Sequence, residues 1–152
     1  MKILISRCLL GIACRYDGKG AADTAVCRFM EEIGQDSFVS VCPETAAGLA
    51  IPRSPAELCD GRVIDKNGRD MTSDFELGAR LALECAEKNS CNCALLKSRS
   101  PSCGNGTVYD GTFSGTLIRA DGITASLLKA HGIAVFSELQ LDGLRKYLNA
   151  GH

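Results

Sequence analysis

The sequence predicts an α/β fold, an open three-layer sandwich in which helices cover both faces of a mostly parallel sheet of about four strands. Four short apolar runs, at residues 2–6, 37–41, 91–97 and 133–136, have the composition of buried strands. Segments with helical spacing of apolar residues lie between them, and this alternation favours parallel strands joined by right-handed crossovers. The length of 152 residues suits a single domain spanning residues 1–152, and we also expect short hairpins within it.

The first half of the chain supplies two of these strands and one clear helix. KILIS (2–6) opens the sheet, and SFVSV (37–41) stops at a Cys-Pro pair. Between them, residues 23–34 carry apolar side chains at helical spacing after a capping Asp23 or Thr24. Further along, the Asn-Gly pair in RVIDKNGRDMT predicts a small hairpin.

The second half repeats the alternation. SDFE (73–76) has the pattern of a capping box at the start of a helix, and CNCALLK (91–97) follows as the third strand. The Asp-Gly pair in VYDGTF predicts another hairpin, and the next helix ends at Gly132. IAVF (133–136) is the fourth strand, after which Ser137-x-x-Gln140 is expected to cap the last helix.

Charge and hydropathy exclude some partners. Lys and Arg total 17, Asp and Glu total 18, and the net charge is −1 at pH 7, so no nucleic-acid surface is evident. The N-terminal run MKILISRCLLG is interrupted by Arg7 and is too short for a secretion signal or a membrane span. We therefore expect a cytoplasmic protein with no nucleic-acid or membrane partner, and the sequence leaves the oligomeric state open.

Nine cysteines are many for this length, and their positions separate them into groups. Cys8, Cys42 and Cys103 each follow a predicted strand, so the parallel arrangement would bring them to the same carboxyl edge of the sheet. Cys91 and Cys93 alternate within the third strand and are expected to point to one face and fill the core. Cys27 and Cys85 lie on predicted helices and are expected to pack against the core. Cys14 and Cys59 are left unassigned.

The three thiols after strands suit an iron–sulfur cluster better than zinc. The sequence has no CxxC motif, and its two histidines, His131 and His152, lack ligand-like spacing. A cubane cluster normally takes four cysteine ligands, so a cluster with three would keep one iron open. An open iron is a Lewis acid with affinity for soft sulfur, and it would suit a substrate that carries a thione, thiolate or sulfide.

Residues beside these cysteines have two possible roles each. Pro43 fits the first position of a helix, which would place Glu44 either as a general base for water or as an ordinary first-turn glutamate. Serines 98, 100 and 102 in SRSPSCG could serve the site as hydrogen-bond or proton donors, or could simply shape the loop. Arg53 is expected to pair with Glu57 at i,i+4, with contact to an anionic substrate as the alternative.

Three blocks of the sequence, CLLGIACRYDG, CPETAAGLAIPR and SRSPSCGNG, resemble in order and interval the thiouracil desulfidase family, also called YbbK-like and once classed as a domain of unknown function. The resemblance covers essentially the whole chain. It implies an α/β domain with a [4Fe–4S] cluster held by only three cysteines, matched here by Cys8, Cys42 and Cys103.

The resemblance also implies a reaction. The fourth iron takes up the sulfur of a thiolated pyrimidine (a base, nucleoside or nucleotide), water attacks the carbon, and sulfide leaves without net electron transfer. A glutamate and a serine carry protons in this family. The glutamate is matched here by Glu44 and the serine by Ser100, with Ser102 as the next candidate.

Two other functions fit parts of the sequence. A strand followed by a cysteine and an arginine resembles the phosphate loop of small tyrosine phosphatases and arsenate reductases, with Cys8 as nucleophile. However, Cys8 and Arg15 are spaced C-x6-R instead of C-x5-R, and no Asp-Pro acid loop occurs. The other alternative is a redox or oxygen sensor, in which the cluster would respond to oxidant without catalysis.

Overall fold

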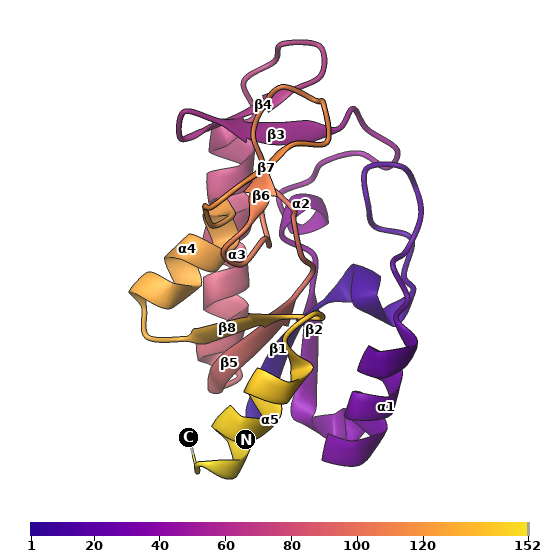
Figure 1. The fold of residues 1–152 in the computed structure, drawn as a ribbon, viewed down its shortest axis with the longest axis vertical. Helices are drawn as coiled ribbons and strands as arrows, with labels where there is room; N and C mark the ends of the chain where they lie inside the picture. The colour runs from indigo at the N-terminus through magenta and orange to yellow at the C-terminus, as the bar shows by residue number, and fades with distance from the viewer. Residues whose placement is uncertain (152) are drawn as a thin grey trace.

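The structure, a computed structural model, describes residues 1–151 and contains the predicted parallel sheet. Its four strands lie in the order β2-β1-β5-β8, and every neighbouring pair is parallel (Figure 1). The strands are β1 (Lys2–Ser6), β2 (Phe38–Val41), β5 (Cys91–Leu96) and β8 (Ala134–Ser137). The α/β class and the mostly parallel sheet are therefore confirmed, while His152 lies outside the described residues.

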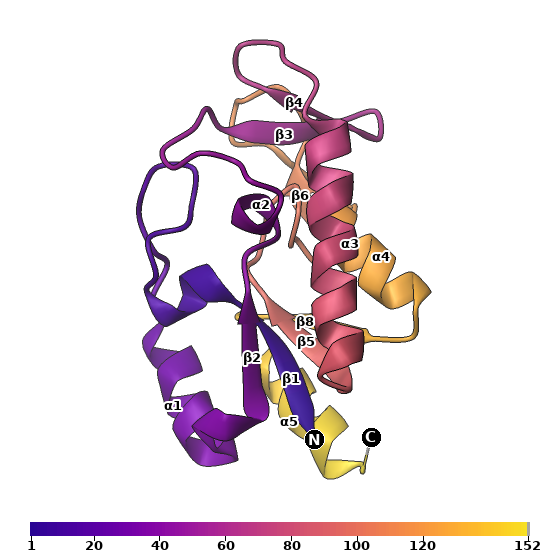
Figure 2. The ribbon, with the colours of Figure 1, turned by 180° about the vertical axis from the view of Figure 1, so that it is seen from behind.

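Helices cover both faces of the sheet, which makes three layers (Figures 1 and 2). On one face, α3 (Thr72–Lys88) and α4 (Ile123–Ala130) pack against Leu4 and Leu96. On the other, α1 (Thr24–Ile33) and α5 (Leu141–Asn149) pack against Ile3, Ile5 and Leu95. None of the helices within residues 1–151 is long and apolar enough to cross a bilayer.

Short elements connect these layers at the carboxyl edge of the sheet. The 3-10 helix η1 (Arg7–Leu10) follows β1, and the single helical turn α2 (Pro43–Ala46) follows β2. A second 3-10 helix, η2 (Gln35–Ser37), leads into β2 at the opposite edge. The predicted position of Pro43 at the first helical residue is confirmed.

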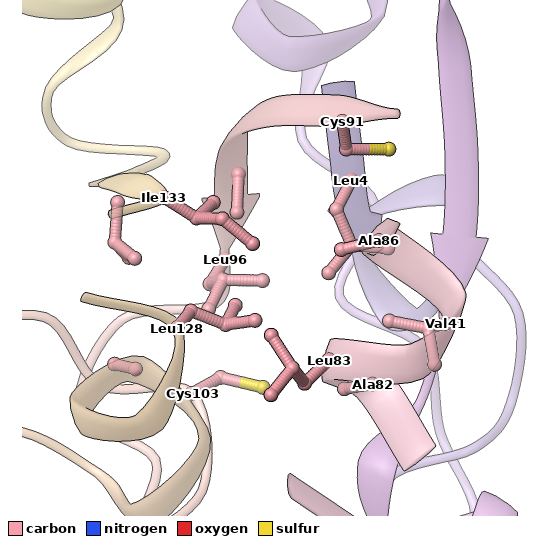
Figure 3. Close-up of a cluster of buried hydrophobic side chains, with 13 residues drawn as sticks. Leu4, Val41, Ala82, Leu83, Ala86, Cys91, Leu96, Cys103, Leu128 and Ile133 are labelled. Atoms are coloured by element: carbon pink, nitrogen blue, oxygen red, sulfur yellow. The ribbon is translucent and has the colours of Figure 1, made fainter. Parts of the chain in front are cut away.

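The two cysteines of β5 lie on opposite faces of the sheet, so the expectation that they share a face is wrong. Cys91 packs with Leu4 and Ala86 on the side of α3, as Figure 3 shows, whereas Cys93 belongs to the cluster around α1 and α5. The pairing of β1 with β5 shifts register here, because Lys2 pairs with Cys91 and the next residue already pairs with Cys93. This bulge breaks the alternation on which the expectation depended.

Two hairpins stand above the sheet. In the first, β3 (Ala56–Cys59) and β4 (Arg62–Asp65) are joined at Asp60-Gly61, where both residues have positive φ, as a tight hairpin turn requires. The predicted Asn-Gly turn follows β4, and beyond it Asp70 forms an antiparallel bridge with Ile64, so the small hairpin predicted there is confirmed. In the second, β6 (Val108–Tyr109) and β7 (Leu117–Ile118) are joined by a longer loop that begins with the Asp-Gly pair.

Helix starts agree only partly with the predicted caps. Asp23 caps α1 by accepting the Val26 N–H at 3.0 Å, as expected. The predicted capping box at residues 73–76 does not form, because α3 begins two residues earlier than a Ser73 cap requires and Met71 occupies its N-cap. Ser137 and Gln140 do bond to each other, but ahead of α5, where the Gln140 side chain accepts the Ser137 N–H at 2.9 Å.

The contact between α2 and α3 requires a glycine. A Cβ at Gly78 of α3 would lie 2.3 Å from the carbonyl oxygen of Pro43, so the helices approach this closely only because residue 78 has no side chain. Since Pro43 follows Cys42, this contact fixes the chain on one side of the carboxyl edge of the sheet.

We expect Gly78→Ala to lower the free energy of unfolding by about 1–3 kcal/mol, because the added methyl group forces α2 and α3 apart. Urea denaturation measures this loss. Gly143→Ala is the matched control, since a Cβ there would meet only the Phe136 ring at 3.6 Å, an ordinary contact. The control should gain up to about 1 kcal/mol from helix propensity. Equal stability of the two variants would contradict the close-approach argument.

Candidate functional site

A cavity of ≈ 550 Å³ opens at the carboxyl edge of the sheet, where ligands bind in open α/β folds. The three cysteines that follow strands all line it: Cys8 from η1 after β1, Cys42 after β2, and Cys103 from the loop after β5. Residues far apart in the sequence therefore meet at one wall, because the three strands are adjacent and parallel.

These thiols are largely buried and influence one another. Cys8 is 8% exposed and Cys103 is 6% exposed, while Cys42 is half-buried. Burial, together with the neighbouring Cys42, raises the pKa of Cys8 to about 11. Burial also raises the pKa of Cys103. Cys8 and Cys103 therefore remain protonated at neutral pH unless something positively charged binds to them and displaces the protons.

A fourth thiol, Cys14, lines the same cavity, and sequence reasoning left it unassigned. It is 4% exposed, and its carbonyl oxygen lies 3.8 Å from the Cys42 sulfur, which donates a weak hydrogen bond to it. Burial and the nearby Cys42 raise the pKa of Cys14 to about 12. The signal was present in the sequence, because Cys14 lies in the same N-terminal block as Cys8.

The cysteines at this cavity are all free thiols. Within residues 1–151, no group of three His, Cys, Asp or Glu side chains is placed to hold a single metal ion. Thiolate donors without histidine are the usual ligands of iron–sulfur clusters, and the cavity wall offers that chemistry.

Glu44 also lines the cavity, but its partner differs from the expected pairing. Arg53 forms an ion pair with Glu44 and donates to the carbonyl oxygens of Ala50 and Cys14, so the predicted Arg53–Glu57 pair is wrong. The segment from residue 53 to β3 is not helical, so residues four apart do not meet. Glu57 instead accepts backbone N–H groups from the β6–β7 loop at 3.0 and 3.1 Å.

The serines of the SRSPSCG loop have different surroundings. Ser100 lines the cavity, and its hydroxyl oxygen accepts the N–H groups of Ser102 and Cys103 at 3.0 and 3.1 Å. The Ser100 hydroxyl acts only as an acceptor in these two bonds, so its hydrogen can be donated to another group. Ser102 is buried at 1% exposure and bonds to the Thr124 hydroxyl at 2.8 Å on the α4 side. Geometry thus favours Ser100 for contact with a ligand.

The cavity lining holds more basic than acidic residues: Arg7, Arg15, Arg53, Arg69, Lys97 and Arg99 against Glu44, Glu57 and Asp65. Within residues 1–151, four of these arginines form no ion pair: Arg7, Arg15, Arg69 and Arg99. Arg99 has a φ of 66°, a left-handed conformation that directs the chain sharply after β5. The charge favours a ligand with an anionic group.

Comparison with known proteins agrees with this geometry. The model of the 2-thiouracil desulfurase family matches residues 3–140. The chain belongs to this family. The chain is also similar to the uncharacterized protein YbbK of Bacillus subtilis (strain 168), which is 38% identical over 152 residues, covering 93% of this chain and 99% of YbbK.

A solved structure supports the same family assignment. The [4Fe-4S]-dependent thiouracil desulfidase TudS is 41% identical, with a TM-score of 0.91 and 98% of each chain covered. Membership of the 2-thiouracil desulfurase family favours the desulfidase interpretation of the sequence over the phosphatase and sensor alternatives.

Arg53 joins three segments of the cavity wall, so we expect Arg53→Ala to lower the free energy of unfolding by about 1–3 kcal/mol. The side chain is only 11% exposed, and its removal leaves Glu44 and two carbonyl oxygens without their donor. Urea denaturation of the metal-free protein measures the loss. Arg62→Ala is the control, because the Arg62–Asp70 pair is exposed to solvent and should contribute little to stability. Similar losses of unfolding free energy in both variants would contradict the conclusion that Arg53 holds the cavity wall together.

Proposed function

We propose that this protein is an iron–sulfur-dependent, non-redox desulfidase that removes sulfur from a thiolated pyrimidine as sulfide. The observation that carries the proposal is the meeting of three strand-end cysteines at one cavity, in a chain that aligns with TudS over nearly its whole length. In the overall reaction, water and a thiocarbonyl group give a carbonyl group and hydrogen sulfide. A carbon–oxygen bond replaces a carbon–sulfur bond, and no electrons are transferred.

Cys8, Cys42 and Cys103 are the ligands that we assign to a [4Fe–4S] cluster. Each is available as a free thiol, and each lines the cavity. With three cysteine ligands, the bound cluster supplies a Lewis-acidic open iron for the substrate sulfur. The rest of the reaction depends on the protein groups around it, which must bind the pyrimidine ring and move protons.

Glu44 is the group that we assign as general base. Its carboxylate lies at the cavity in the first turn after Cys42, and the Arg53 guanidinium holds it in one orientation. A carboxylate oxygen in that position can accept a proton from the attacking water as the oxygen bonds to carbon.

Ser100 is the group that we assign to the second proton transfer. Its oxygen already accepts two backbone N–H groups, so its own O–H can donate toward the cavity. A hydroxyl oriented in this way can pass a proton to the departing sulfur. Ser102, the other candidate, is already paired with Thr124 away from the cavity lining, which makes its role structural in this proposal.

The substrate class follows from the size and charge of the cavity. A volume of ≈ 550 Å³ falls in the range of small-molecule sites, about 300–1,000 Å³, and suits a pyrimidine with its sugar. The unpaired arginines at the cavity offer partners for a phosphate group. Within the class of thiolated pyrimidines, these charges favour a nucleotide over the free base.

The deciding experiment is a sulfide-release assay with anaerobically reconstituted protein. We expect the protein to be brown, to release sulfide from 2-thiouracil or from a thiolated pyrimidine nucleoside or nucleotide, and to act best on the nucleotide. A protein that binds the cluster, changes absorbance with oxidant and releases no sulfide from any of these compounds would instead be a sensor.

Replacement of a ligand should remove the cluster. We expect Cys103→Ala to lose most of its iron and its charge-transfer absorbance, because only two of the three thiolates remain. Iron and sulfide analysis with the visible spectrum measures the loss. Cys93→Ser is the control, since Cys93 lies fully buried in the cluster of α1 and α5, away from the cavity. A full cluster in Cys103→Ala would exclude this cysteine as a ligand.

Replacement of a proton carrier should spare the cluster and slow the reaction. We expect Glu44→Gln and Ser100→Ala to keep wild-type absorbance and to lose about 10²–10⁴-fold in kcat, because each removes a proton carrier and no ligand. Steady-state sulfide release measures kcat. Ser102→Ala should lose stability but keep turnover, since its hydroxyl bonds to Thr124. Wild-type kcat in Glu44→Gln would remove this residue from the mechanism.

A further inference from the structure

Tyr16 presents an aromatic ring at the cavity to which the assigned ligands and proton carriers give no role. It lines the cavity and is 39% exposed. Among residues 1–151, two other aromatic side chains line the cavity, but Phe75 is only 3% exposed and packs with Leu58 and Val63 in a hydrophobic cluster. The other one, Tyr109, is half-buried in the hairpin β6–β7. The Tyr16 ring is therefore the most accessible aromatic surface at this cavity.

The loop that carries Tyr16 is bonded to the wall that holds the assigned general base. The Tyr16 carbonyl oxygen accepts the Arg53 backbone N–H at 2.7 Å. The guanidinium group of the same arginine donates to the Cys14 carbonyl oxygen at 3.3 Å and forms the ion pair with Glu44. One residue therefore fixes both the backbone around Tyr16 and the carboxylate of Glu44, so these two residues belong to the same wall of the cavity.

The Arg15 guanidinium occupies one face of the Tyr16 ring. Its central carbon lies over the ring, 5.9 Å from the centroid, an arrangement in which the cation and the π-system attract each other. Among residues 1–151, no second aromatic ring pairs with Tyr16. The opposite face can therefore accept a flat ligand without displacing a protein ring.

A pyrimidine base fits the chemistry of this surface. Bases are flat, and they stack on tyrosine rings because each of them has a π-face. Thiourea carries the same thiocarbonyl sulfur on a much smaller π-surface and has no ring. Binding through the sulfur alone would not distinguish the two compounds, whereas stacking on an aromatic side chain would.

We propose that Tyr16 is a substrate-binding residue that stacks on the pyrimidine ring and gives the site its preference for cyclic over acyclic thiocarbonyl compounds. The open face of the ring receives the base, and Arg15 holds the ring from the other side. The bond from Arg53 to the Tyr16 backbone places the bound base on the wall of Glu44. The inference rests on the proposed function, because it states how the substrate of that same site is bound.

The first test compares variants of Tyr16 in anaerobically reconstituted protein. We expect Tyr16→Phe to keep the wild-type KM for sulfide release from 2-thiouracil. Tyr16→Leu keeps apolar bulk but lacks the π-face, so it should raise this KM by about 5–100-fold, the range of base–aromatic stacking, with little change in kcat. The preference for 2-thiouracil over thiourea, taken as the ratio of their kcat/KM values, should fall with it.

Ile12→Ala is the control for these variants, because Ile12 is an exposed apolar residue of the same loop and does not line the cavity. Its KM should equal that of the wild type. A Tyr16→Leu variant with the KM and the preference of Tyr16→Phe would overturn the proposal.

A fluorescence measurement tests the contact without turnover, and it also covers the case in which Tyr16→Leu fails to fold. The chain contains no tryptophan, so Tyr16→Trp gives it a single one at the position in question. We expect uridine 5′-monophosphate to quench its emission. Ribose 5-phosphate, which has the same sugar and phosphate but no base, should leave the emission unchanged. Absence of quenching by the nucleotide, or equal quenching by both compounds, would contradict stacking at this position.

Failure of the inference can be told apart from failure of the proposed function. If the wild-type protein releases sulfide from 2-thiouracil while Tyr16→Leu keeps its KM, only the role of Tyr16 is wrong. A raised KM in Tyr109→Leu alone would assign the base to the other tyrosine and would equally exclude Tyr16. If the wild-type protein binds the cluster but releases no sulfide from any thiolated pyrimidine, the proposed function is wrong, and the fluorescence measurement still decides whether Tyr16 contacts a pyrimidine.

Discussion

The parallel pairing of β1 with both β2 and β5 is the constraint on which the candidate site depends. Backbone hydrogen bonds align the three strands, so their carboxyl ends lie at one edge and the segments that follow them share one cavity. Cys8, Cys42 and Cys103 are 34 and 61 residues apart in succession (42 − 8 and 103 − 42), yet the sheet brings them to the same wall. Any arrangement that reversed one strand would send its cysteine to the opposite edge.

The SRSPSCG loop is rigid because each part of it is bonded to a different neighbour. Glu138 holds Ser98 at the start of the loop, and the Ser100 hydroxyl closes a turn onto the amide groups that follow. At its end, the carbonyl oxygens of Pro101 and Ser102 accept the first N–H groups of α4 at 2.8 Å. Unpaired amides at a helix start need such acceptors, so the loop and the helix stabilise each other.

At the cavity, burial of the thiols and the nearby positive charges have opposite effects on thiolate formation. Burial disfavours thiolates at Cys8 and Cys103, and the positive charges at the same edge, Arg15 and Lys97 among them, oppose this at Cys8. Within residues 1–151, every buried side-chain nitrogen and oxygen has a hydrogen-bond partner. The fully buried polar side chains are therefore held by protein partners.

The class of fold, the four sheet strands and the positions of the three cysteines after strands could all be predicted from the sequence, because apolar runs and helical spacing are local properties of the chain. The resemblance of its blocks to a known family also led to the prediction that Glu44 and Ser100 carry protons. The partners of these side chains became clear only from the folded chain. Arg53 pairs with Glu44 and not with Glu57, and the β5 bulge places Cys91 and Cys93 on opposite faces of the sheet. Pairings of this kind depend on how distant segments pack and on the backbone geometry between neighbours, and residue spacing alone carries neither.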